Sequence, residues 1–166
     1  MFSKMLTKIL VPYDGSKYSV RALARAMELA HNLDSEIFLL TVVNVGYIAP
    51  PGLLSGLVKS KKEKDAVKKW AKTVKADAEK MLKNALKKCE SKGISVSYKV
   101  EEGDIAGKIL DFEKRKKITL IVIGSHGLHG LGKLKTLGSV SRRVSENAKS
   151  PVLIVRWFSQ ALLESE

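Results

Sequence analysis

The chain has 166 residues, of which 45% are hydrophobic, and a formal net charge of +13 at pH 7. This length predicts one domain with a substantial core, and no apolar run approaches the roughly 20 residues of a membrane span. The single cysteine, Cys89, excludes an internal disulfide, and the amino-terminal segment lacks the apolar centre of a secretory signal. We therefore expect a cytoplasmic protein that does not enter a membrane.

A short apolar strand is predicted over 8–11. It ends at Pro12, because proline has no backbone N–H to donate to a strand ladder. Residues 13–16 then form a turn, in which Asp14 or Ser16 caps the following helix. Apolar residues spaced by three and four predict the buried face of this helix; that face consists of Val20, Leu23, Ala24, Met27 and His31.

A second apolar strand is predicted over 36–43 and a long helix over 61–92. Prolines and glycines between them predict a long loop over 44–60. Lysines fill one side of the helix, which is typical of a solvated face. The apolar stripe on its other side consists of Val67, Trp70, Ala71, Val74, Ala78, Met81, Leu82, Ala85 and Cys89.

Polar and apolar residues alternate over 94–100, which predicts a strand with one polar face at an edge of the sheet. A helix capped by Asp104 follows, and its buried stripe contains Ile105, Ile109 and Phe112. The four apolar residues 120–123 predict a strand that is buried on both faces. The last helix is predicted over 139–147, the last strand over 152–155, and a tail over 157–166.

Glycines follow the buried strand 120–123 closely. Gly124 and Gly127 come first, and Gly138 opens the next helix after a ten-residue loop. Glycines let a backbone approach phosphate, and the unpaired N–H groups of a helix start bind it. Turn geometry alone is the competing explanation of the same glycines.

Alternating strands and helices predict a parallel α/β sheet with helices on both faces. Ligands of such sheets bind beyond the carboxyl ends of the strands, where the strand order reverses. Pro12, Tyr13 and Asp14 follow the first strand, and the glycines follow the fourth. If these two strands are neighbours, both segments face one crevice.

Together these segments resemble the universal stress protein family. The resemblance rests on Val11-Pro12-Tyr13-Asp14-Gly15-Ser16, on Gly124-Ser125-His126-Gly127, on Gly138-Ser139-Val140-Ser141 and on 150–155, and it spans about 6–156. It implies a Rossmann-like, open five-stranded parallel sheet of order 3-2-1-4-5 within one domain, residues 1–156. It also implies a homodimer through the last strand, Val152–Val155, and ATP binding, which we expect to involve Mg²⁺ or Mn²⁺.

The resemblance also implies the roles of individual residues. Asp14 would hold the ribose hydroxyls, and Pro12 and Val42 would lie near the adenine. Backbone and hydroxyl contacts to ribose and phosphates would come from Gly124, Gly127, Gly138, Ser139 and Val140. Tyr13, Ser125 and His126 complete the predicted nucleotide site. The chain departs from the family pattern at one point, because the loop 128–137 is one residue longer than the family's nine.

Three functions follow from these observations. The first is an ATP-binding regulatory protein of the stress response, which acts through binding and an unidentified signalling partner. The second is an enzyme, a weak ATP hydrolase or a nucleotidyl transferase, although the lysine-bearing P-loop pattern is absent from the sequence. The third is a basic nucleic-acid-binding module, which rests on charge alone. A zinc site at His126 and His129 lacks further ligands.

Two explanations remain for the apolar strand 152–155. A second copy of the chain covers this edge in a homodimer, or the tail, through Ala161, Leu162 and Leu163, folds back over it.

Overall fold

The computed structural model describes residues 8–44, 61–127 and 137–156, with the backbone alone for 62–64. Five parallel strands form one sheet in the order β3-β2-β1-β4-β5, which confirms the predicted topology. Their bounds are Lys8–Pro12 for β1, Glu36–Val43 for β2, Val96–Glu102 for β3, Leu120–Gly124 for β4 and Val152–Val155 for β5. No helix in these ranges is long and apolar enough to cross a membrane.

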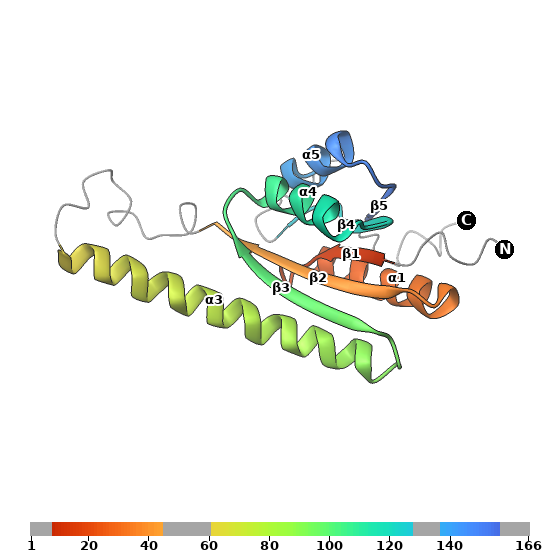
Figure 1. The fold of residues 1–166 in the computed structure, drawn as a ribbon, viewed down its shortest axis with the longest axis horizontal. Helices are drawn as coiled ribbons and strands as arrows, with labels where there is room; N and C mark the ends of the chain where they lie inside the picture. The colour runs from red at the N-terminus through yellow and green to blue at the C-terminus, as the bar shows by residue number, and fades with distance from the viewer. Residues whose placement is uncertain (1–7, 45–60, 128–136, 157–166) are drawn as a thin grey trace, which may run out of the picture.

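Helices cover both faces of the sheet (Figure 1). One face carries α1 (Lys17–Leu33) and α3 (Lys61–Glu90), and the other carries α4 (Ile105–Lys116) and α5 (Ser139–Asn147). Successive side chains of a strand point to opposite faces. Ile9 and Val11 of β1 therefore enter the core under α1 and α3, whereas Leu10 enters the core under α4 and α5.

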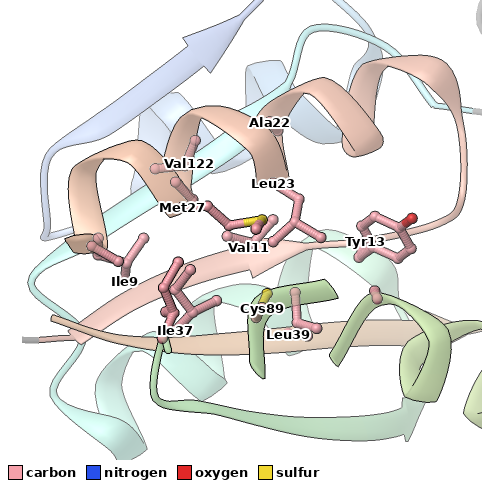
Figure 2. Close-up of a cluster of buried hydrophobic side chains, with 14 of the residues drawn as sticks. Ile9, Val11, Tyr13, Ala22, Leu23, Met27, Ile37, Leu39, Cys89 and Val122 are labelled. Atoms are coloured by element: carbon pink, nitrogen blue, oxygen red, sulfur yellow. The ribbon is translucent and has the colours of Figure 1, made fainter. Parts of the chain in front are cut away.

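The core under α1 and α3 is apolar and tightly packed (Figure 2). Cys89 lies in it with no exposed surface, as predicted. Burial raises the pKa of its thiol to about 11, and the neighbouring Glu90 adds to the shift. The thiol therefore stays protonated at neutral pH and behaves as a small apolar side chain.

The predicted buried face of α1 was partly wrong. Leu23 and Met27 are buried, but Val20 is 41% exposed, and Ala24 and His31 also face outward. Alanines at intervals of four residues, together with Leu23 and Met27, line the side that meets the sheet; they are Ala22, Ala26 and Ala30. Small side chains let α1 lie close to β4, and this closeness decided the buried face.

Two further boundaries differ from the prediction. The edge position of β3 is confirmed, but the strand covers Val96–Glu102 rather than 94–100. The long helix ends at Glu90, two residues early, and its stripe is buried only from Ala78 onward. The first half of α3 extends beyond the ends of the strands, so its apolar residues are only half-buried (Figure 1); they are Val67, Trp70, Ala71 and Val74.

Glu113, near the end of α4, is a buried carboxylate that the sequence did not reveal. It is 2% exposed, and its Oε1 accepts hydrogen bonds from the backbone N–H groups of Lys149 (2.8 Å) and Ser150 (2.6 Å). These bonds fix the segment that leads into β5. Ser150 is half-buried and the carboxylate is buried, so the loss of this acceptor is costly.

We expect Glu113→Ala to lower the free energy of unfolding by about 2–3 kcal/mol, because it leaves two backbone donors without an acceptor. Glu113→Gln retains one acceptor oxygen and is the matched control, with a smaller loss. Urea unfolding followed by circular dichroism measures both. An alanine variant with the wild-type midpoint would show that these bonds contribute nothing to stability.

Candidate nucleotide site

The first side of the site is the turn that follows β1. The backbone N–H of Tyr13 donates to Leu40 O (2.8 Å), and the hydroxyl of Thr41 donates to Tyr13 O (2.6 Å). These bonds fix Asp14 beyond the carboxyl end of the strand. Thr41 was missed in the sequence, although a polar residue within an otherwise apolar buried strand was a usable signal.

Asp14 and Ser16 both accept hydrogen bonds at the amino end of α1. The Ser16 hydroxyl accepts from Ser19 N (3.1 Å) and caps the helix, while Asp14 Oδ1 accepts from Ser16 N (3.0 Å). The sequence left open which of the two residues caps the helix, and the structure assigns the cap to Ser16. The carboxylate of Asp14 stays half-buried at the strand end.

The second side of the site is the segment that follows β4. Ser125 connects three elements there, because its N–H donates to Val155 O (2.9 Å) and its carbonyl accepts from Gly138 N (2.9 Å). The hydroxyl of Ser141, another residue that the sequence reasoning missed, also donates to Ser125 O (2.9 Å). The loop end is therefore held against β5 and against the start of α5.

The two sides meet, because β1 and β4 are neighbours in the sheet. A Cβ atom added to Gly127 would lie 2.9 Å from Asp14 Oδ2. The carboxylate and the glycine backbone thus lie side by side at the point where the strand order reverses, which is where the sequence predicts the crevice. Ligands of open parallel sheets bind at this position.

The amino end of α5 lies beside the same predicted crevice, because Gly138 N donates to Ser125 O. Gly138 is its N-cap residue and has no side chain to cap the helix. Helix geometry leaves the N–H groups of Ser139 and Val140 without intrahelical acceptors. The aligned dipoles of the helix make this end favourable for an anion.

The three glycines of the motif have different surroundings. A Cβ on Gly124 would lie 2.8 Å from the backbone carbon of Tyr18, so this glycine lets α1 pack on β4. A Cβ on Gly138 would lie 3.2 Å from Ser125 O and 3.4 Å from His126 Cα. A side chain at Gly127 would therefore meet the Asp14 carboxylate and one at Gly138 the Ser125 carbonyl, whereas Gly124 is required by the packing of α1 on β4.

Three predicted site residues have side chains that pack against the protein itself. Tyr13 lies in the hydrophobic core (Figure 2), where burial, followed by the charge of Asp14, raises the pKa of its phenol. Ser125 is 2% exposed, and its hydroxyl lies 3.0 Å from His126 Nδ1. The His126 ring packs against Tyr18 of α1, with ring centroids 5.1 Å apart.

Pro12 and Val42 lie on the same face of adjacent strands. Pro12 pairs with Leu40 in the parallel register, and Val42 follows two residues later on that side of β2. Both are half-buried, and Val42 packs against the core under α4 and α5. This placement suits an apolar wall beside the crevice.

Three further observations concern metal ligands, surface hollows and the loop 128–137. Nowhere in 8–44, 61–127 and 137–156 do three metal-ligating side chains come together. A surface hollow of about 310 Å³ lies at the opposite end of the sheet, beside Ser35 and Ser95, and none of the predicted site residues lines it. The predicted loop 128–137, whose extra residue departs from the family pattern, falls outside the described residues except for Leu137.

Comparison with known proteins gives consistent matches along the chain. The model of the universal stress protein family matches residues 5–156. Universal stress protein YxiE of Bacillus subtilis is 36% identical over 92% of this chain and 100% of its own length. Universal stress protein MJ0531 of Methanocaldococcus jannaschii is 33% identical over 90% of this chain and 81% of its own length.

Solved structures share the fold. The hypothetical protein MJ0577 has a TM-score of 0.79 at 24% identity and covers 93% of this chain and 99% of its own. A universal stress protein in complex with cAMP covers 91% of this chain and 97% of its own, with a TM-score of 0.63 at 22% identity. A universal stress protein family protein from Arabidopsis thaliana with AMP bound covers 93% of this chain and 94% of its own, with a TM-score of 0.61 at 20% identity.

Proposed function

Because this chain belongs to the universal stress protein family, we propose that it is a cytoplasmic regulatory protein of the stress response that binds ATP. The observation that carries this proposal is the meeting of Asp14 with Gly127 beside the uncapped start of α5. The relatives with cAMP and AMP support an adenine nucleotide as the ligand.

Each part of a nucleotide has a counterpart in the crevice. The carboxylate of Asp14 accepts hydrogen bonds from the ribose hydroxyls, and such charge-assisted bonds are stronger than neutral ones. The free N–H groups at the start of α5 bind phosphate. Pro12 and Val42 offer an apolar wall to the adenine. Mg²⁺ or Mn²⁺ would bind mainly through the phosphates and water, as Mg²⁺ commonly does.

We infer that the protein acts by binding ATP rather than by rapid turnover. The serine–histidine pair Ser125 and His126 is unsuited to nucleophilic catalysis because the Ser125 hydroxyl is buried. A regulatory protein of this kind presents a different surface to its signalling partner when the nucleotide is bound.

Displacement of a fluorescent ATP analogue by unlabelled nucleotides tests the proposed ligand. We expect ATP, AMP and cAMP to displace the analogue, and CTP to do so much more weakly because its base does not fit the adenine wall. Equal displacement by all nucleotides would show that the site recognises phosphate but not adenine. Displacement by none would contradict it.

We further propose a homodimer through β5. This strand ends the sheet among the described residues, and Leu153 on it is 37% exposed. An apolar strand edge without a covering element promotes association, and a twofold axis would place the same strand of a second copy against it. The alternative covering, by residues 157–166, falls outside the described residues.

Leu153→Lys is expected to convert the dimer to a monomer, because it places a charge in the apolar interface. Val20→Lys is the matched control, since Val20 is the other large apolar side chain that is well exposed in the described part of the chain. Light scattering measures the mass of both variants. A wild type that is monomeric at micromolar concentration would refute the dimer, and a Leu153→Lys variant that remains a dimer would refute β5 as its interface.

A further inference from the structure

The solvent side of α3 carries a stripe of lysines that the nucleotide site does not use. They are spaced at intervals of three, four or eight residues along one line of the helix and are all exposed; the stripe consists of Lys69, Lys72, Lys80, Lys83 and Lys87. Ala76 occupies the one remaining position of this line between Lys69 and Lys87, and no acidic residue lies on the line between these two lysines. We call these five lysines the basic stripe.

The basic stripe lies opposite the side of α3 that faces the sheet. The apolar line of α3 runs through 71, 74, 78, 82, 85 and 89 and is buried from 78 onward, and the basic stripe has the same spacing shifted by two residues. Two residues correspond to about 200° around an α-helix. The stripe therefore points directly away from the body of the protein, and its length is about 27 Å.

Little in the described part of the chain neutralises these charges. The ion pair that α3 forms there joins Lys75, outside the stripe, to Glu102 (2.7 Å). Three of the five acidic residues of α3, Glu63, Asp77 and Glu79, lie on other lines of the helix, and the remaining two, Asp65 and Glu90, lie at the two ends of the stripe. A line of like charges held on a rigid helix attracts a partner with regularly spaced negative charges.

We propose that the basic stripe binds the phosphate backbone of a nucleic acid. A membrane is the less favoured partner, because a surface helix must insert its apolar side, and here that side faces the sheet. A duplex carries one negative charge per roughly 1.7 Å, so it supplies charges along the full length of the stripe. No aromatic residue lies in the stripe, so the contacts reach phosphates and show no base preference.

Fluorescence anisotropy with a labelled duplex of about 20 base pairs, longer than the stripe, tests the proposal. With five phosphate contacts, log K is expected to fall with log salt with a slope of about −4.5, equally for duplexes of different sequence. Replacing Lys72, Lys80 and Lys83 by glutamine should reduce the slope to about −2 and weaken binding more than tenfold at low salt.

The control replaces Lys114, Lys116 and Lys117 by glutamine. This variant loses the same net charge, but from the end of α4 on the opposite face of the sheet. ATP binding and the melting temperature, measured on both variants, report folding and the nucleotide site separately. The proposal is overturned if both variants weaken DNA binding equally, or if the wild type binds no duplex at low salt. Binding to phosphatidylglycerol-containing vesicles without binding to DNA would instead identify a membrane partner and overturn it too.

Discussion

Gly138→Val is expected to abolish nucleotide binding while the protein keeps its fold. The new Cβ would lie 3.2 Å from Ser125 O, and the valine methyl groups would stand over the first N–H groups of α5. Phosphate could not then approach these donors. The fold should lose only about 1 kcal/mol, because valine is a poor N-cap residue but the site is half-exposed.

Gly124→Val provides the contrast within the same motif. Its Cβ would collide with the backbone of Tyr18 at 2.8 Å, so α1 could no longer pack on β4. We expect this variant to lose the fold and nucleotide binding together. Calorimetric titration with ATP and thermal unfolding measure the two properties separately. If Gly138→Val binds ATP as the wild type does, this glycine serves only the turn.

Asp14→Asn is expected to weaken ATP binding by about 10- to 100-fold, because the ribose hydroxyls lose a charged acceptor worth about 1.5–3 kcal/mol. Asparagine keeps an oxygen that can accept from Ser16 N, so the start of α1 and the stability should change little. Asp14→Ala removes this acceptor as well and should also lower stability.

Dideoxy-ATP, which has no ribose hydroxyl, supplies the control for Asp14. The wild type and Asp14→Asn should bind this ligand with equal affinity, because the carboxylate has nothing to accept from it. If the substitution weakens ATP and dideoxy-ATP by the same factor, Asp14 acts through the structure of the turn rather than through the ribose.

The sequence predicted the fold well because its strands are continuous apolar runs and its turns contain proline and glycine. It also predicted that Asp14 and Gly127 would lie together, since parallel topology brings the ends of neighbouring strands to one edge of the sheet. It could not show that the side chains of Tyr13 and His126 turn away from that edge. Their orientation depends on packing against α1 and the core.

Other predictions were wrong or missing because they also depend on contacts between segments that are distant in the sequence. Glu113 precedes a basic run at the end of a helix, which is typical of a solvated position, and its hydrogen-bond partners lie about 36 residues later in the chain. The apolar period of α3 continues past the end of the sheet. Periodicity indicates which side of a helix is apolar but not what covers that side, so the sequence could not show where its burial begins. The buried face of α1 followed from close packing of alanines, which a count of large apolar residues does not detect.

Calorimetric titration of the wild-type protein with ATP, in the presence of Mg²⁺ or Mn²⁺, tests the central claim most directly. The crevice between Asp14 and α5 predicts saturable binding of one nucleotide per chain, and the affinity should be lost in Gly138→Val. An absence of binding at ligand concentrations of about 1 mM, which corresponds to less than about 4 kcal/mol of binding free energy, would contradict the assignment of a nucleotide site.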